Sequence, residues 1–174
     1  MYDHTINSLP ENNTKFHWKK IGISGNLGKT NNLKTLNELL IENGHLNENN
    51  MILKMDAEYY EWEALSDISE NTLKQFKYIL MEFHFRYDDQ MPLYYKILKK
   101  LSNTHQIIYM HCNRCGIIKY FKNIICSSIE ISYIIKDNNQ FTKDESIYPI
   151  PELETRKCGK LSKLDLNLFK LFYY

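Results

Sequence analysis

The chain has 174 residues, of which 43% are hydrophobic and 25% charged, and its formal net charge is +1. This length suits one domain with its own core, and the balanced charge excludes the basic surface typical of nucleic-acid-binding proteins. No apolar run approaches the roughly 20 residues that span a bilayer, and the polar start MYDHTINSLPENN lacks a signal peptide's apolar core. We therefore expect a cytoplasmic protein that binds neither nucleic acid nor membranes.

Strand-like and helix-like segments alternate between residues 16 and 137. The expected strands are FHWKKIGI (16–23), MILKMD (51–56), KYILMEFHF (77–85), IIYMHCN (107–113) and IEISYIIKD (129–137). The expected helices are 32–43, 61–68 and 91–103. Asn31 and Asn32 are candidate caps of the first helix, and Gly44 is its expected stop.

This alternation predicts an α/β domain with a mostly parallel sheet. We expect a single domain over residues 1–174, with a loop at 1–15, an α/β core at 16–137 and a C-terminal extension at 138–174. Trp18 and Trp62 are expected to anchor the packing. Lys96, Lys99 and Lys100 are expected on the solvated face of their helix.

The stretch IGISGNLGKT, residues 21–30, is similar to the phosphate-binding loop of P-loop NTPases, because it follows an expected strand and ends in Gly-Lys-Thr. Such a loop needs its first glycine five positions before Gly28. That position holds Ile23, and Gly22 lies one place too early. The spacing therefore favours an ordinary strand–helix loop over a nucleotide site.

Polar pairs stand near the carboxyl ends of three expected strands. The pairs are Asp56/Glu58, Glu82/His84 and His111/Asn113. Side chains two residues apart share one face of a strand, and ligands of open α/β sheets bind beyond the carboxyl ends of the strands. We predict that the pairs converge on one rim, with the histidines as candidate general bases. Capping of the next helix is the alternative role for the first pair.

Two kinds of metal site stay open at this point. The rim could bind a divalent cation through oxygen and nitrogen, but no local spacing directs these atoms to one ion, so we assign no metal ligands. His111, Cys112, Cys115 and Cys126 invite a zinc site or a redox role, although a lone C-x-x-C lacks a second pair. We expect reduced cysteines in the core or in loops.

Residues 53–65, LKMDAEYYEWEAL, resemble the "LKIDxE…EW..L" signature of FkbM-type and related methyltransferase-like domains. YDHT (2–5), LKTLNELL (33–40), MEFHF (81–85), HCNRC (111–115) and the strand IEISYII are similar to flanking segments of these domains, in the right order. The similarity runs from about Tyr2 to Pro151. It implies an S-adenosylmethionine-dependent methyltransferase with a Rossmann-like three-layer sandwich. The implied strand order is 3-2-1-4-5-7-6, with the last strand antiparallel.

The resemblance also implies roles for the rim. Asp3 and Asp56 would bind the cofactor, His84 or His111 would take the proton of a small-molecule acceptor, and Glu58, Glu82 and Asn113 would bind that acceptor. The expected reaction is O-methyl transfer to a small or sugar-like molecule.

In these families a first strand and a Gly-rich cofactor loop precede the segment that YDHT resembles. We therefore expect an N-terminally truncated domain that lacks both, because GNLG (25–28) follows the third strand and cannot replace the loop. The alternatives are a non-catalytic domain that self-associates through its open sheet edge and a metal-assisted enzyme.

Overall fold

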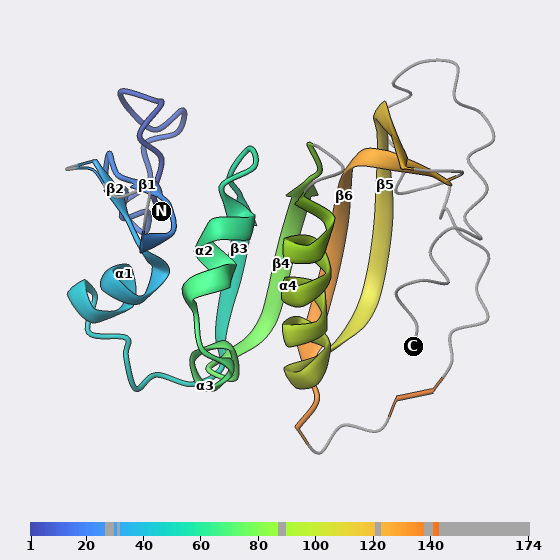
Figure 1. Cartoon of the computed structure of the whole chain (residues 1–174). Coiled ribbons are helices and arrows are strands. Elements are labelled where there is room, and N and C mark those ends of the chain that lie inside the picture. The colour runs from blue at the N-terminus through green and yellow to red at the C-terminus, as the bar shows by residue number, and fades with distance from the viewer. Residues whose placement is uncertain (27–29, 31, 87–89, 121–122, 138–140, 143–174) are drawn as a thin grey trace.

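The structure is a computed structural model and describes residues 1–26, 30, 32–86, 90–120, 123–137 and 141–142. The elements are β1 Gly22–Ile23, β2 Leu33–Lys34, α1 Leu36–Glu42, β3 Met51–Asp56, α2 Glu61–Asp67, α3 Glu70–Leu73, β4 Phe76–His84, α4 Met91–Thr104, β5 His105–Tyr120 and β6 Asn123–Ile135 (Figure 1). The expected strands at 51–56 and 77–85 and the expected helices at 61–68 and 91–103 are confirmed to within one residue at each end. The strands expected at 107–113 and 129–137 form as well. The first lies within the longer β5, and the second ends two residues earlier than expected, at Ile135 of β6.

Among the described residues, the main sheet has four strands in the order β3-β4-β6-β5. β3 and β4 are parallel, whereas β6 is antiparallel to both of its neighbours. Only two residues separate β5 from β6, which is too short for the crossover that parallel neighbours need. The sheet is therefore mixed, and the predicted mostly parallel pattern holds only for β3 and β4. The observed order corresponds to the 4-5-7-6 part of the strand order that the family resemblance implies. In this correspondence β6 is the antiparallel last strand.

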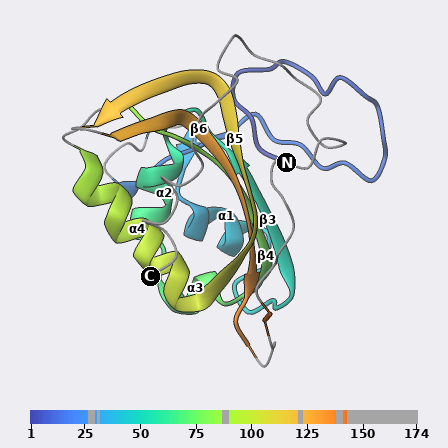
Figure 2. The ribbon, with the colours of Figure 1, turned by 90° about the vertical axis from the view of Figure 1, so that its right-hand side faces the viewer.

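The helices α2, α3 and α4 lie on one face of this sheet (Figures 1 and 2). Alternate residues of β4 are buried towards them, including Ile79, Met81 and Phe83, and Ile129 and Ile131 of β6 join the same core. Within the described residues the arrangement has two layers, so the expected three-layer sandwich is not formed by this part of the chain. None of the described helices is long and apolar enough to cross a membrane.

Trp62 anchors α2 to the sheet and to α4, as predicted. Its ring lies 4.5 Å from the Phe83 ring and 4.2 Å from the Tyr94 ring, centroid to centroid. Its indole N–H donates to the His84 carbonyl oxygen at 2.6 Å. This bond fixes α2 against the end of β4, where the predicted rim begins.

Lys100 does not lie on a fully solvated helix face, as the sequence predicts. Its half-buried ammonium donates to the carbonyl oxygens of Leu65, Ser66 and Ile68 at 2.6, 3.0 and 2.8 Å. It thereby satisfies carbonyl groups at the C-terminal end of α2, which have no partners within that helix. Burial lowers the pKa of Lys100. Tertiary contact between α4 and α2 decides this position, and helical periodicity cannot show it.

The N-terminal third departs most from the prediction. The strand expected at 16–23 is reduced to Gly22–Ile23, with one isolated bridge between Tyr2 and Lys19. The first helix begins at Leu36, because Thr35 and Glu38 form a reciprocal capping box. Asn32 is therefore not its cap, and Asn31 lies outside the described residues. Gly44, with a φ of 71°, follows the end of α1 as expected.

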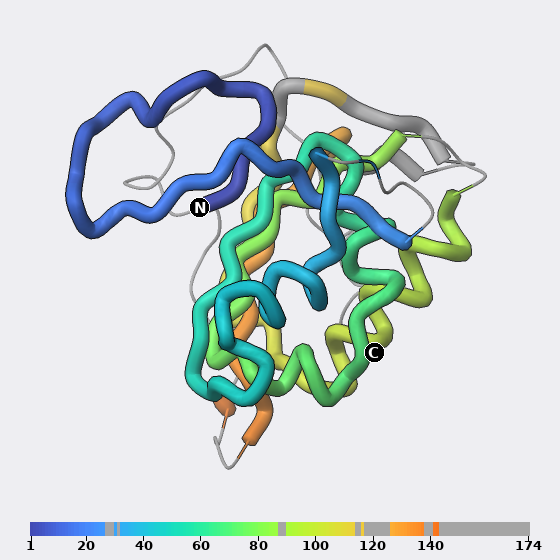
Figure 3. The backbone as a smooth tube through the Cα atoms, turned by 90° about the vertical axis from the view of Figure 1, so that its left-hand side faces the viewer, coloured from blue at the N-terminus to red at the C-terminus, as the bar shows by residue number. Residues whose placement is uncertain are grey.

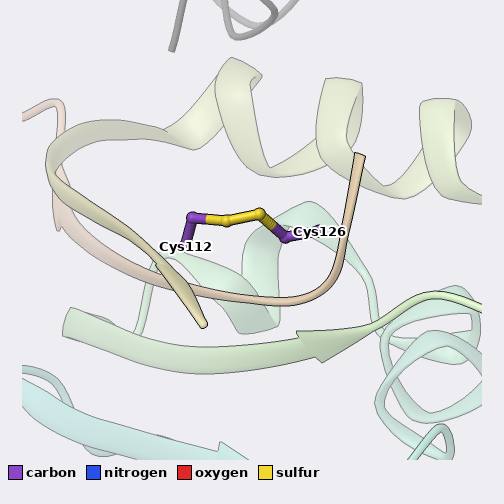
Figure 4. The surroundings of a disulfide bond; sticks show 2 residues. All are labelled: Cys112 and Cys126. Carbon is purple, nitrogen blue, oxygen red and sulfur yellow. A yellow bond between two sulfur atoms is a disulfide. The ribbon is translucent and has the colours of Figure 1, made fainter. Parts of the chain in front are cut away.

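Cys112 and Cys126 form a disulfide between β5 and β6 (Figure 4). Their Cα atoms lie 6.0 Å apart, within the usual range for this bond. The prediction of reduced cysteines is therefore wrong for this pair, and Cys112 is no thiolate ligand for zinc in this state. Antiparallel pairing of β5 and β6 brings the two residues together, and their spacing in the sequence does not show it.

His105 predicts a measurable pH dependence of stability. Its buried ring lies with Nε2 2.9 Å from the Phe76 carbonyl oxygen and Nδ1 2.7 Å from Thr104 Oγ1. Burial lowers its pKa from the ordinary value of 6.5. The unfolded chain therefore binds a proton before the folded chain does as the pH falls. The contribution of His105 to stability is complete above the unfolded pKa and is lost as the pH falls from there towards the folded-state pKa.

We expect the wild type to lose more stability than His105→Gln between about pH 7.5 and 5.5, by up to about 1.4 kcal/mol per pH unit. Urea unfolding of both proteins at each pH measures this difference. Other titrating groups are shared by the two proteins and cancel in the comparison. Equal losses in both proteins would show that His105 titrates as it does in the unfolded chain.

Candidate functional site

The carboxyl ends of β3 and β4 lie side by side at the upper edge of the sheet in Figure 1. Asp56 closes β3 and is the register partner of Glu82 in β4. The turn that follows β3 places Glu58 and Tyr59 in the left-handed region, with φ of 45° and 84°. Such backbone costs on the order of 1–3 kcal/mol per residue for residues other than glycine, and it is concentrated at functional sites. This turn leads directly into α2 at Glu61.

The His84 imidazole lies at the centre of these acids. Its Nδ1 is 3.1 Å from Glu61 Oε1. Its Nε2 faces Asp56 Oδ1 at 3.9 Å, Glu58 Oε2 at 3.5 Å and Glu82 Oε1 at 3.6 Å. The side chain of His84 is 10% exposed, whereas that of Glu58 is 79% exposed. Four carboxylates from β3, its turn, α2 and β4 therefore surround one imidazole.

Glu61 orients this imidazole. Its fully buried carboxylate accepts a hydrogen bond from the His84 backbone N–H at 2.5 Å through the same Oε1 that faces Nδ1. The hydrogen bond to Glu61 raises the pKa of His84, against the lowering effect of burial, and the charges of Glu61, Glu58 and Glu82 add to the rise. When Nδ1 carries the proton and donates it to Glu61, the lone pair of Nε2 points towards the other three carboxylates.

The third predicted pair reaches this cluster in part. Asn113 of β5 donates from Nδ2 to Glu82 Oε1 at 3.3 Å. His111 is half-buried and pairs in register with Glu130 of β6, and Glu130 is in turn the partner of Glu82. His111 therefore lies in the same cross-strand row as Glu82, two strands away, or about 10 Å at the usual strand spacing. The structure brings together Asp56, Glu58, Glu82, His84 and Asn113, and it sets His111 at the end of the row.

A cavity of about 760 Å³ adjoins the cluster. Its lining residues come from β3, the N-terminal segment, β1 and α1, and Figure 3 shows these parts of the chain on the side that faces the viewer. Asp56 and Glu58 line it together with Asp3, and apolar walls come from Leu36, Leu39, Leu40, Leu53 and Met55. Within the described part of the chain, β3 pairs only with β4 in the main sheet. The opposite edge of β3 is therefore unpaired in that sheet.

Asp3 stands on the N-terminal wall of this cavity. Its Oδ1 accepts hydrogen bonds from Thr5 Oγ1 at 2.6 Å and from the Thr5 backbone N–H at 2.8 Å. These bonds lower the pKa of Asp3, so the carboxylate is ionised at neutral pH. The Trp18 indole donates to the Asp3 carbonyl oxygen at 3.2 Å and ties this residue to the following segment. Asp3 in the N-terminal segment and Asp56 at the end of β3 therefore line the same cavity.

The model of the methyltransferase FkbM domain matches residues 5–116, close to two thirds of the chain. This chain belongs to the FkbM methyltransferase domain family. The match includes the whole carboxylate cluster and confirms the resemblance that residues 53–65 carry. Neither a curated protein nor a solved structure matches the chain.

Sequence reasoning about this FkbM domain misses Glu61 as a member of its site. Glu61 stands at the start of a helix, where an acid normally complements the helix dipole, and no local rule shows that it is fully buried. Tyr59 packs its ring 5.4 Å from the His84 ring, and the Arg86 guanidinium lies 4.3 Å from the centre of the Tyr59 ring. The pair Glu61-Trp62 within the family signature is the available signal for Glu61.

The described part of the glycine-rich stretch at 21–30 contacts the C-terminal end of α2. At its described end, the Asn26 backbone N–H donates to the Asp67 carboxylate at 2.5 Å. Residues 27–29 and 31 are outside the described part. The one loop N–H that the structure describes as bonded to α2 therefore donates to a carboxylate.

Proposed function

We propose that this FkbM domain transfers a methyl group from S-adenosylmethionine to a hydroxyl of a small or sugar-like acceptor. The observation that carries the proposal is the His84 cluster, which opens beside a cavity lined by two aspartates. Family membership supports methyl transfer, and the geometry supports the division of labour: the donor lies in the cavity and the acceptor on the rim, with Asp56 shared between them.

The cavity suits the cofactor in size and chemistry. Its volume of about 760 Å³ lies within the roughly 300–1,000 Å³ of small-molecule sites. The carboxylates of Asp3 and Asp56 are acceptors for ribose hydroxyls, and the leucine-rich wall suits an adenine ring. The cofactor supplies an electrophilic methyl group on a positively charged sulfur, whose charge the nearby acids favour.

The rim suits an acceptor hydroxyl. Glu58, Glu82 and Asn113 offer hydrogen-bond partners for a polyhydroxylated molecule, and the Nε2 lone pair of His84 is placed to accept a proton. With the cofactor held by Asp3 and Asp56 as the methyl donor, Nε2 of His84 would accept the proton that the acceptor hydroxyl gives up. Glu61 stabilises the resulting imidazolium through Nδ1. His111 remains a second candidate base from the sequence.

Calorimetric titration of the purified chain with S-adenosylmethionine tests the proposal. We expect binding that weakens about tenfold or more in Asp3→Asn, because a hydrogen bond to a charged acceptor contributes about 1.5–3 kcal/mol. Glu63→Gln is the matched control, since Glu63 is exposed on α2 and should leave the affinity unchanged. Bound cofactor then justifies a screen of hydroxylated acceptors.

A folded chain that binds no cofactor would contradict the proposal. If that chain also sediments as a dimer, the result favours the second candidate, a non-catalytic domain that pairs through the open edge of β3. Ile52 on this edge strand is 64% exposed, which is the observation that favours pairing with a second copy. Ile52→Lys should then restore the monomer.

A further inference from the structure

We propose that Asp56, Glu82 and the Nε2 atom of His84 bind a divalent cation of the magnesium–manganese type. The sequence alone assigns no metal ligands, because nothing in the local spacing joins β3 to β4. The proposal rests on the contacts of these side chains and does not depend on methyl transfer, so the two can fail separately.

The distances around His84 suit a shared ion better than direct hydrogen bonds. The gaps from Nε2 to the Asp56 and Glu82 oxygens are 3.9 and 3.6 Å, longer than a hydrogen bond. The three donor atoms all lie within 4.8 Å of one another. Ligands about 2.1 Å from one ion are separated by about 3 Å when adjacent and about 4 Å when opposite. Shifts of well under about 1 Å would therefore bring all three to bonding distance.

The charge of the cluster also calls for a cation. Asp56, Glu58, Glu61 and Glu82 face a single imidazole, so four acidic side chains share one cationic partner at most. Among the described residues, no Lys or Arg forms an ion pair with any of these carboxylates. The Arg86 guanidinium lies over the Tyr59 ring. Like charges held this closely are costly without a counter-ion.

Glu61 supplies an independent observation. It is fully buried, and its Oε2 has no hydrogen-bond partner within the described part of the chain, although buried carboxylate oxygens are normally satisfied. Its other oxygen holds His84 Nδ1 at 3.1 Å. A buried carboxylate that orients the far nitrogen of a histidine is the usual support of a metal-bound imidazole. The positioning is complete before any ion is added.

The donor set selects the kind of cation. Two carboxylates and one imidazole suit Mn²⁺ and tolerate Mg²⁺, whereas Ca²⁺ prefers oxygen alone. Asn113, bonded to Glu82, holds that ligand in place. A cation on Nε2 would also change the chemistry of the proposed methyl transfer. A hydroxyl bound to the ion loses its proton more readily, and His84 then acts as a ligand and not as a base.

Mn²⁺ alone, without S-adenosylmethionine or acceptor, is the probe. We expect calorimetry to show one Mn²⁺ per chain, with affinity reduced at least about tenfold in Glu82→Gln and in Asp56→Asn. Both substitutions keep the side-chain shape and remove one charge, and the amide oxygen introduced by Glu82→Gln can still accept the Asn113 hydrogen bond. Glu63→Gln removes an exposed carboxylate outside the cluster and should bind Mn²⁺ as the wild type does.

The position of the ion can be read from paramagnetic broadening of NMR signals. The Trp62 indole N–H, which donates to the His84 carbonyl, should broaden at substoichiometric Mn²⁺. The ring of His105 contacts Phe76 at the opposite end of β4, about 26 Å from His84 at about 3.3 Å per strand residue, and its signals should persist. This pattern needs no variant, so it decides the matter if a substitution prevents folding.

No stoichiometric Mn²⁺ binding by the folded wild type would overturn the proposal. Binding that survives both Glu82→Gln and Asp56→Asn, or that broadens both regions equally, would do the same. If the ion binds as described and S-adenosylmethionine does not, the cation site stands and the proposed methyl transfer fails.

Discussion

Trp62→Ala is expected to lower the free energy of unfolding by about 3–5 kcal/mol, the range for removing a large aromatic side chain from a core. The ring is 2% exposed and packs against Phe83 and Tyr94. Its loss leaves a cavity between α2, α4 and the sheet, and it leaves the His84 carbonyl without the indole donor. Because small domains have only about 5–15 kcal/mol in total, the variant should be close to unfolding at about 25 °C.

Guanidinium unfolding followed by far-ultraviolet circular dichroism measures this loss. Two variants separate its causes. Trp62→Phe keeps an aromatic ring but is smaller and lacks the indole N–H. Loss of the N–H should cost about 1–2 kcal/mol beyond the effect of the smaller ring. Trp18→Ala removes a half-buried indole from the N-terminal segment and should cost less than Trp62→Ala. Similar losses for the two alanine variants would show that Trp62 is not the main anchor.

In the metal-free protein, His84→Gln is expected to reduce methyl transfer by about 10²–10⁴-fold, the usual contribution of a positioned acid–base group. The structure shows contacts at ion-pair distance between the His84 ring and all four acids of the cluster. The loss should appear in kcat, with S-adenosylmethionine affinity nearly unchanged, because His84 does not line the cavity. Formation of S-adenosylhomocysteine with an acceptor found in the screen measures it.

His111→Gln is the informative comparison, since the sequence proposes both histidines as bases. His111 pairs in register with Glu130 and stands two strands from Glu82, so we expect its loss to be smaller than that of His84. A larger effect at His111 would indicate that His111, at the far end of the row, is the base. Cation binding also distinguishes the two histidines, because His84→Gln should weaken Mn²⁺ binding and His111→Gln should not.

Local rules in the sequence were sufficient for the part of the fold that carries the site. β3, β4, α2 and α4 match their predicted bounds closely, because each has a clear apolar period and a clear start or stop. The polar pairs at 56/58 and 82/84 were recognisable for a related reason: strand side chains alternate, and parallel strands that follow one another end at the same sheet edge. The family signature at 53–65 lies within this well-determined region.

Competing local signals explain the errors in the N-terminal third. The apolar pattern from Leu33 onwards is compatible with a helix, yet Thr35 and Glu38 cap each other and leave Leu33 and Lys34 to pair with β1. Long-range pairing explains the others. The disulfide depends on which strands become neighbours, and the capping of α2 by Lys100 depends on how α4 packs. None of these is encoded in a short stretch of chain.

The sequence by itself therefore determined the family, the principal strands and helices, and the rim as a set of polar side chains at strand ends. Only the tertiary structure decided which of them meet. It set His84 among four carboxylates, recruited the buried Glu61 as the group that orients the ring, brought Asn113 to Glu82 and left His111 two strands away. The physical reason is that side-chain period and turn chemistry act over a few residues, whereas charge and hydrogen-bond satisfaction in a buried cluster depend on contacts between strands and helices far apart in the chain.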